Sequence, residues 1–374
     1  MQDYYQQNVF GNDYPNIVVL LSLTGTLSLV FTNGCASLVQ ILISYVGVTW
    51  SMTIGSLLLS MGLIFAGFST QVWHLYLTQG ILFGLGSSIC YVTSMGVVPQ
   101  YFERKRGLAM GIVTSGTGVG GLIVPFIMDA INQSLGGAWT YRILGFICLA
   151  SNVVTVLLVR ERVPRSLKTK KKFSDIIQFE ILKDVNFDIW CVIACLQVMG
   201  YFLPYFYLPS YATHLGLSAS DGTAIVSVTS AANIVGRILA GIVADRIGHL
   251  STNIIFTFIS ALSAFLIWTF AYSYGVLMAF GVVFGLVGGS YSPLISPITA
   301  SVIGMEKLAT GFSLTLLFTV IALWSPMISS AIEDSVDPEP FLTYKMYTGV
   351  TFLLASLTGL LLKLKMKRNL FVKF

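Results

Sequence analysis

The most constraining feature of this sequence is a long uncharged stretch near its start. From Tyr14 to Phe102 the chain contains no Asp, Glu, Lys or Arg. Charged side chains normally cover the water-facing surface of a soluble domain, so a soluble domain of ordinary size cannot be built from such a stretch. A helix that crosses a bilayer needs about 20 mostly apolar residues. The stretch therefore predicts three or four membrane-spanning helices joined by very short turns.

The rest of the chain has the same character. Hydrophobic residues make up 55% of the sequence and charged residues 10%. This composition excludes a disordered chain and argues against nucleic-acid binding, despite a net charge of +5. The apolar runs are continuous and do not alternate with polar residues, which argues against a transmembrane barrel. We therefore expect an all-α membrane protein.

Apolar windows between clusters of turn-forming and charged residues predict about eleven membrane-spanning helices. The predicted spans are 16–43, 48–69, 71–98, 104–130, 138–160, 188–213, 220–244, 250–272, 274–303, 309–332 and 342–364. Basic residues accumulate in short cytoplasmic loops of such proteins. With these spans, 18 of the 21 Lys and Arg residues fall on one side. The distribution predicts an external N-terminus and a cytoplasmic C-terminus.

The longest polar connector divides the chain into two halves. Residues 161–187 form a basic loop between an N-terminal bundle, 1–160, and a C-terminal bundle, 188–374. Short matches at an offset of 200 or 201 residues relate the halves: Phe83-Gly84-Leu85 with Phe284-Gly285-Leu286, Leu108–Gly111 with Leu308–Gly311, and Gly47 with Gly248. Two parallel, pseudo-symmetric bundles are the plan of major facilitator transporters, whose substrate site lies at mid-membrane between them.

The two halves have unequal numbers of predicted helices. Five helices precede the basic loop and six follow it. We therefore expect the first helix of the N-terminal bundle to be missing from this sequence, through truncation or an incomplete gene model. A protein that naturally has eleven helices is the alternative.

One loop of the second half resembles the G-x-x-x-D-R-x-G loop of major facilitator proteins. It runs from Gly241 to Gly248 and contains Asp245 and Arg246. An acid at a helix end can engage a neighbouring helix terminus, and glycines allow close approach. We predict a conformational latch whose members are Gly241, Asp245, Arg246, Gly248, Glu103, Arg104 and Arg106. The equivalent loop of the first half, from Gln40 to Gly47, lacks the charged pair. That Arg246 only marks the cytoplasmic side stays open.

The segment Tyr101-Phe-Glu-Arg-Lys-Arg-Gly-Leu-Ala-Met-Gly111, with the glycine-rich run to Gly121, resembles the signature before and within the fifth helix of the monocarboxylate transporter family. Trp73–Gly86 is similar to the fourth helix of its fungal members. The resemblance covers nearly the whole chain and is strongest from 70 to 125. The spacings Gly107/Gly111 and Gly116/Gly120 also predict close helix packing in lipid.

This resemblance implies a secondary transporter that moves a small organic anion by alternating access. No clustered His or Glu residues and no nucleophile–base pair are visible in the sequence, so we expect no enzymatic activity, and we expect no cofactor, metal or nucleic acid. The expected partners are the solute and membrane lipid, with an accessory membrane protein left open. The family's acidic-glycine-tryptophan signature and a substrate-binding lysine belong to the first helix, so neither can be assigned here.

Arg237 is the residue that we predict to bind the substrate. It lies eight residues before Asp245, which places it roughly 12 Å into the bilayer. Arg at a helix centre costs on the order of 2.5–3.5 kcal/mol to insert, so such residues usually have a function. A guanidinium can bind a carboxylate through two parallel hydrogen bonds. Pairing of Arg237 with a helix carbonyl, or snorkelling to the interface, is the alternative.

Asn233 lies one turn before Arg237 on the same helix face, and we predict that it shares the substrate site. In animal members of the family this position resembles an acidic residue implicated in proton coupling. An amide cannot titrate, which puts coupling through this pair in doubt. Facilitated diffusion and another proton carrier both stay open. Further candidates to line the cavity are Tyr91, Tyr205, Tyr207 and Tyr291.

Three functions follow from these patterns. The leading hypothesis is a monocarboxylate-transporter-like permease of fungal type, in the plasma membrane or alternatively the vacuolar membrane. The second keeps the family and changes the solute, for example to riboflavin. The third is a membrane sensor, scaffold or truncated paralogue that transports nothing.

Overall fold

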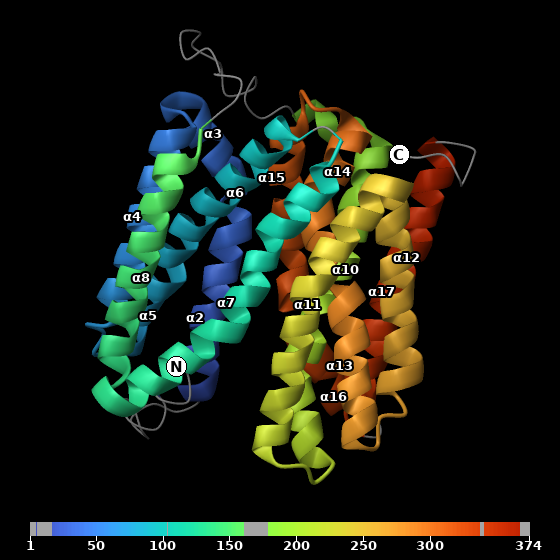
Figure 1. Cartoon of the computed structure of the whole chain (residues 1–374). Coiled ribbons are helices and arrows are strands. Elements are labelled where there is room, and N and C mark those ends of the chain that lie inside the picture. Colours follow the sequence, from blue (N-terminus) through green and yellow to red (C-terminus); the bar gives the residue numbers. More distant parts are fainter. Residues whose placement is uncertain (1–4, 6–16, 103, 161–178, 337–339, 367–374) are drawn as a thin grey trace. The chain divides into compact units, whose positions relative to one another are not determined.

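The computed structural model describes residues 5, 17–102, 104–160, 179–336 and 340–366 (Figure 1). All regular secondary structure within these residues is helical, which confirms the all-α prediction. Ten helices in this part of the chain are long and apolar enough to cross a membrane, and a bent helix pair brings the number to eleven if it counts as one span. The predicted number of about eleven is therefore confirmed.

The chain divides into two compact units, which we describe separately. The first contains Met1–Tyr101 and Ile123–Gln178, and the second contains Phe102–Leu122 and Phe179–Phe374. Helix α7 (Arg106–Leu135) begins in the second unit and ends in the first. The units thus differ from the predicted bundles in the placement of Phe102–Leu122. Most of the predicted basic loop, 161–178, lies outside the described residues.

In the first unit, helix α4 packs against both α6 and α8 (Figure 1). A buried cluster that includes Leu63, Tyr141 and Leu144 fills the space beside it. Besides the last part of α7, the helices of this unit are α2 (Ile17–Gly34), α3 (Ala36–Val46), α4 (Val48–Ala66), α5 (Val72–Leu75), the π-helical η1 (Tyr76–Leu82), α6 (Phe83–Tyr101) and α8 (Gly137–Leu158).

The first predicted helix, 16–43, differs from a single span. It corresponds to α2 and α3, whose axes are bent by 51° at a break after Gly34. The residues before the break are Asn33 and Gly34, and both types have low helix propensity. Gly is also a frequent cause of sharp helix bends. Local sequence therefore explains why this span is broken.

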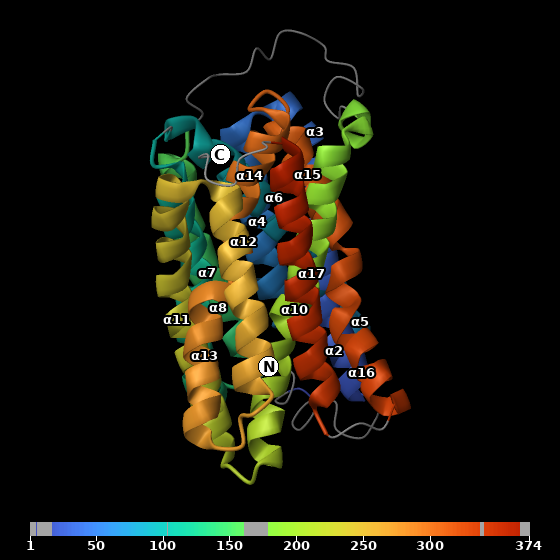
Figure 2. The ribbon, with the colours of Figure 1, turned by 90° about the vertical axis from the view of Figure 1, so that its right-hand side faces the viewer.

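In the second unit, α11 packs along α13, and α17 packs along both α10 and α12 (Figure 2). Buried rings connect α13 to its neighbours, with centroids 5.0 Å apart for Phe280 and Trp268 and 5.7 Å for Phe284 and Phe352 of α17. The helices are η2 (Phe179–Lys183), α10 (Val185–His214), α11 (Ala219–Ile247), α12 (His249–Leu262), the π-helical η3 (Ser263–Trp268), α13 (Tyr274–Gly288), α14 (Tyr291–Ile303), α15 (Leu308–Thr319), η4 (Ile321–Trp324), α16 (Ser325–Val336) and α17 (Leu342–Met366).

The sequence match between Gly47 and Gly248 extends to the backbone. Gly47 has φ 82° and ψ 171° between α3 and α4, and Gly248 has φ 99° and ψ 146° between α11 and α12. This region of φ and ψ is essentially restricted to glycine. In both turns a hydroxyl four residues later, on Ser51 or Thr252, donates to the glycine carbonyl. Each unit therefore turns directly from one helix into the next through the same device.

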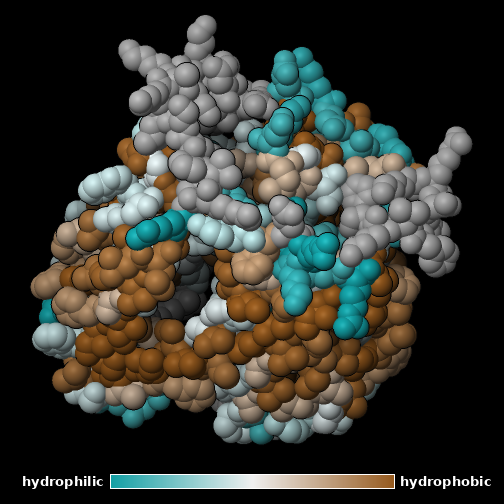
Figure 3. Space-filling view, turned by 45° about the horizontal axis from the view of Figure 1, so that its top comes forward, coloured by the Kyte–Doolittle hydropathy of each residue, from teal (hydrophilic) through white to brown (hydrophobic). Residues whose placement is uncertain are grey.

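The outer faces of the helices are apolar, as a membrane requires. Leu157 on α8 is 71% exposed and Ile321 beside α15 is 70% exposed. Figure 3 shows hydrophobic side chains over most of the visible sides, with hydrophilic side chains gathered toward the top of the view. Such an apolar surface would be costly in water and is favourable against lipid tails.

Candidate functional site

Arg237 is buried in the second unit, with 7% of its surface exposed. It lies near the middle of α11, ten residues before the helix ends at Ile247. Its Nε donates to Asn233 Oδ1 at 2.7 Å, its Nη1 to the Thr114 carbonyl at 2.7 Å, and its Nη2 to Tyr201 Oη at 3.2 Å. Nη1 also donates to Thr117 Oγ1. Arg237 therefore joins α11 to α7 and α10.

Asn233 lies one turn before Arg237 and is 2% exposed. While its oxygen accepts from Arg237, its amide nitrogen donates to the Gly285 carbonyl of α13 at 3.2 Å. A Cβ on Gly289 would lie 2.2 Å from that nitrogen, so the side chain is held tightly. The predicted pairing of Asn233 and Arg237 thus has direct geometric support.

Three partners of Arg237 were not identified from the sequence: Thr114, Thr117 and Tyr201. Thr114 and Thr117 belong to the glycine-rich run that the family resemblance singled out, but nothing in that run alone points to Arg237. Among the tyrosines proposed as cavity-lining, Tyr205 lies next to this group, with its ring centroid 5.3 Å from that of Tyr201. We call Arg237, Asn233, Thr114, Thr117 and Tyr201 the Arg237 cluster.

The Arg237 cluster contains no carboxylate. Within the described residues, all four acceptors of Arg237 are neutral oxygens: an amide, a backbone carbonyl, an alcohol and a phenol. A guanidinium has five N–H groups, and these four bonds leave one Nη2–H over in this part of the chain. A buried cation without a counter-charge is costly unless an anion joins it. The cluster is therefore suited chemically to an anionic ligand.

Asp245 forms a second polar contact between α11 and α7. Its Oδ1 accepts from the Gly107 amide at 2.8 Å and its Oδ2 from the Leu108 amide at 2.9 Å. Since α7 begins at Arg106, these amides belong to the first turn, whose N–H groups have no intrahelical partner. The carboxylate also faces the positive end of the helix dipole. This contact is the Asp245 cap, and its effect on stability is about 1 kcal/mol by analogy with other helix caps.

Glycines bring the two helices close at the Asp245 cap. A Cβ on Gly241 would lie 2.3 Å from the Gly107 carbonyl oxygen, and one on Gly111 would lie 2.5 Å from that of Arg237. The predicted role of Gly107 and Gly111 in close packing is therefore confirmed. The prediction for Gly116 and Gly120 is wrong, because a Cβ at either position would meet nothing within 4 Å. Spacing alone did not reveal which face of α7 meets α11.

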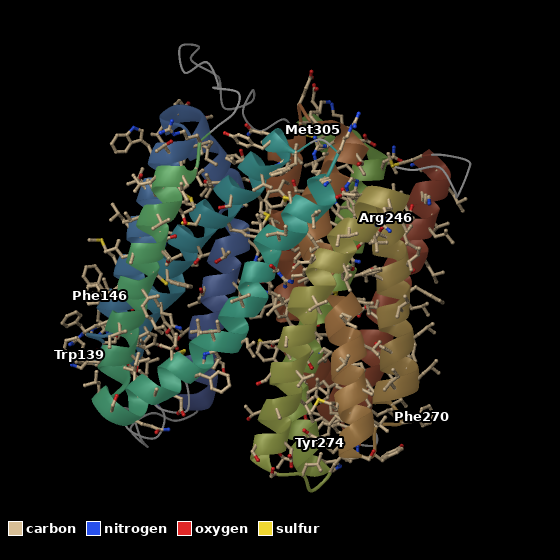
Figure 4. The ribbon with its side chains drawn as sticks, viewed as in Figure 1. Trp139, Phe146, Arg246, Phe270, Tyr274 and Met305 are labelled. Atoms are coloured by element: carbon tan, nitrogen blue, oxygen red, sulfur yellow. The ribbon has the colours of Figure 1, made fainter. Side chains whose placement is uncertain are left out.

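Not every predicted latch residue reaches this contact. Arg246 and Arg104 are exposed, and the Nε of Arg106 donates to the nearby Phe102 carbonyl at 3.1 Å. Gly248 forms the turn that follows α11, whereas Glu103 lies outside the described residues. Figure 4 shows Arg246 and Met305 at one end of the second unit and Phe270 and Tyr274 at the other.

Three further tyrosines were proposed as cavity-lining residues. The Tyr207 ring stacks on Tyr344 with centroids 3.7 Å apart, and its hydroxyl donates to the Pro326 carbonyl. Tyr291 lies beside Trp190 at 6.4 Å, and Tyr91 belongs to α6 of the first unit. Among the residues that the structure describes, no group of three or more His, Cys, Asp or Glu side chains is placed to hold a metal ion.

Comparison with known proteins identifies the family. Residues 12–327 match the family model described as Major Facilitator Superfamily. The agnestins efflux protein AgnL12 of Paecilomyces divaricatus is 30% identical over 100% of this chain and 84% of its own length. The probable transporter MCH2 of Saccharomyces cerevisiae is 27% identical over 83% of this chain, which corresponds to 66% of MCH2.

The fold is also similar to a solved transporter structure. The proton:xylose symporter XylE, bound to 6-bromo-6-deoxy-D-glucose, superposes with a TM-score of 0.76 at 13% identity, over 99% of this chain and 90% of XylE. At that identity the similarity concerns the fold alone, and it agrees with the major facilitator fold expected from the sequence. The apolar spans, the fold and the family match together show that this chain is an integral membrane protein of the major facilitator superfamily, a family of solute transporters.

Proposed function

We propose that this chain is a secondary transporter of small organic anions, monocarboxylate-like in their chemistry, that works by alternating access. The observation that carries the proposal is the Arg237 cluster. Among the residues that the structure describes, the partners that hold this guanidinium inside a membrane-spanning helix are neutral, so a carboxylate ligand would supply the missing negative charge. The family resemblance of Tyr101–Gly121 and Trp73–Gly86 points to the same class of solute.

The geometry of the cluster supports recognition of a carboxylate at two points. The Nη2 of Arg237 and the hydroxyl of Tyr201 are 3.2 Å apart. Tyr201 accepts in this bond, so its own O–H can point to a further acceptor. One carboxylate could therefore accept from Arg237 and Tyr201 together. Hydrogen bonds to charged groups are worth about 1.5–3 kcal/mol each, which is sufficient for selection of anions over neutral solutes.

The decisive experiment compares Arg237→Gln and Arg237→Lys with the wild type. Uptake of [14C]pyruvate is measured in a host lacking its own carriers, and membrane abundance is measured in parallel. Arg237→Gln removes the charge and should reduce uptake by at least tenfold, while Arg237→Lys keeps the charge, loses the planar fork and should raise KM. Lys307→Gln removes a positive charge at an exposed position and is the matched control. Unchanged uptake by Arg237→Gln at normal abundance would refute the proposal.

The Asp245 cap supports a role as the conformational latch. It ties two helices together through one carboxylate and two backbone amides, an arrangement that is made or lost as a unit. We propose that it stabilises one access state and that the exposed Arg104 and Arg246 contribute charge at the same membrane surface. Arg246 and Tyr274 lie at opposite ends of the unit (Figure 4), which supports the assignment of successive loops to opposite sides of the membrane.

For orientation, we propose a cytoplasmic C-terminus and an external N-terminus, in the plasma membrane. The basic asymmetry of the sequence supports this orientation, because 18 of 21 Lys and Arg residues share one side. Single cysteines in place of Arg246 and Tyr274 test it with a membrane-impermeant maleimide. Only the cysteine at 274 should react in intact cells.

Export is a second candidate for the direction of transport. AgnL12, whose match covers 100% of this chain and 84% of AgnL12, is named as an efflux protein. This relationship favours export over import as the physiological direction. Export of the solute is measured with short monocarboxylates added as competitors and, separately, with riboflavin added. Inhibition by the monocarboxylates supports the carboxylate hypothesis, and inhibition by riboflavin supports transport of another solute.

A further inference from the structure

The charged and imidazole side chains around α11 are concentrated at helix ends. The helices packed against α11 in the second unit are α10, α12, α13 and α14, together with the first part of α7. Their charged and imidazole side chains within the described residues all lie within four residues of a helix end, Arg237 alone excepted. These end residues are Arg106, Asp188, His214, Asp221, Asp245, Arg246 and His249.

The direct partners of Arg237 are all uncharged. Asn233, the Thr114 carbonyl, Thr117 and Tyr201 hold the guanidinium, and amides, alcohols and phenols are uncharged near pH 7. The guanidinium itself does not release its proton in proteins. The cluster therefore has a fixed charge of +1 and no group that can pick up a proton on one side of the membrane and release it on the other.

We infer that this chain carries its anion without a co-transported proton, so that transport is electrogenic. This inference rests on the proposed function and adds its energy source. The empty site has a charge of +1 and the site with a bound carboxylate has a net charge of zero. The solute enters and leaves as the same deprotonated carboxylate, so each full cycle moves one negative charge across the membrane.

The consequence for direction is quantitative. One elementary charge crossing a membrane potential of 100 mV changes in free energy by about 2.3 kcal/mol, which corresponds to roughly a 50-fold concentration ratio at 1.36 kcal/mol per tenfold. A potential that is negative inside drives an anion outward. A cell with such a potential would therefore use this protein to export the anion, with no need for a proton gradient.

The test uses the full chain in liposomes, with [14C]pyruvate as the probe and valinomycin with a potassium gradient to set the potential. At equal pH on both sides, 100 mV positive inside should raise internal pyruvate roughly 50-fold over the external concentration. At zero potential, a pH difference of one unit should leave the distribution unchanged, whereas proton symport would change it about tenfold. Liposomes with Arg237→Gln define the leak.

The outcomes separate the two proposals. Pyruvate uptake that requires Arg237 but follows the pH difference and ignores the potential overturns electrogenic transport and leaves the proposed function standing. No Arg237-dependent uptake under either gradient overturns the proposed function and this inference with it.

A variant designed to gain proton coupling gives an independent test of electrogenic transport. Asn233→Asp places a carboxylate where the amide oxygen now lies 2.7 Å from Arg237 Nε. That carboxylate would pair with the guanidinium and would have to be protonated before a substrate carboxylate could take its place. Uptake by this variant should respond to the pH difference by about tenfold and lose most of its response to potential. If uptake by this variant responds to the membrane potential as the wild type does, the charges assigned to the empty and loaded site are wrong.

Discussion

The turns at Gly47 and Gly248 have the same backbone and different chemistry. Both glycines adopt positive φ, both receive a hydroxyl hydrogen bond from four residues later, and both lead directly into the next helix. Three residues before each glycine, however, the side chains differ: Ser44 in the first unit and Asp245 in the second.

This single difference decides what each turn does. The Ser44 hydroxyl donates to the Ile41 carbonyl of its own helix at 2.8 Å, so its bond stays local. Asp245 instead accepts from the amides of Gly107 and Leu108 on another helix. The turn is therefore a shared structural element, whereas the contact with a helix terminus requires a carboxylate and a partner helix within reach. Three predictions test this separation.

The largest effect is expected from Gly241→Ala, since the contact of Asp245 with α7 depends on close approach of α11 to α7. The new Cβ would meet the Gly107 carbonyl oxygen at 2.3 Å, and backbone atoms cannot rotate away. We expect a loss of about 3 kcal/mol in stability from this overpacking, measured as a lower unfolding midpoint in detergent. Gly116→Ala is the control, because its Cβ meets nothing within 4 Å. Equal midpoints for both variants would show that α7 and α11 are not closely packed.

The next effect concerns the feature that the two turns share. Gly47→Ala and Gly248→Ala each force an L-residue into a backbone conformation that only glycine adopts readily, at a cost of about 2 kcal/mol. Because the backbone angles are alike, the two losses should be similar in unfolding experiments. A loss at one position only would mean that the turns are not equivalent in energy.

The smallest effect on stability is expected from Asp245→Ala, at about 1 kcal/mol. Ser44→Ala should change stability by less than about 0.5 kcal/mol, since only a local hydroxyl bond is lost. For transport, loss of the Asp245 cap should shift the balance of access states by about fivefold, as 1 kcal/mol implies. Labelling rates of a cysteine near Gly107 report that shift. Equal behaviour of the two alanine variants would remove the distinction between the turns.

The fold was largely predictable because a bilayer restricts what a chain can do. Continuous apolar runs predict helices, since every backbone polar group must be paired inside the hydrocarbon. The break at Cys35 was missed because hydropathy measures the length of a run and not the bend within it. The contacts of Phe102–Leu122 with the second unit are a related case, because a loop that separates two predicted bundles does not show which helices a given segment contacts.

The site was only partly predictable. Arg237 and Asn233 could be paired because four residues bring side chains to one face of a helix. Their contacts with Thr114, Thr117 and Tyr201 join residues 36 or more positions apart in the sequence, and no local pattern contains that information. Gly116 and Gly120 illustrate the same limit, because their spacing resembles a packing motif while a Cβ at either position would meet none of the described residues within 4 Å.

The sequence by itself determined that this chain is a helical membrane protein and that Arg237 lies inside a predicted membrane span. That much depends on composition and period, which are local properties. Only the tertiary structure decided that this arginine is held by neutral oxygens and that Asp245, rather than Arg246, engages α7. Charge balance and helix capping depend on which side chains meet in space, and that is set by packing between segments far apart in the chain.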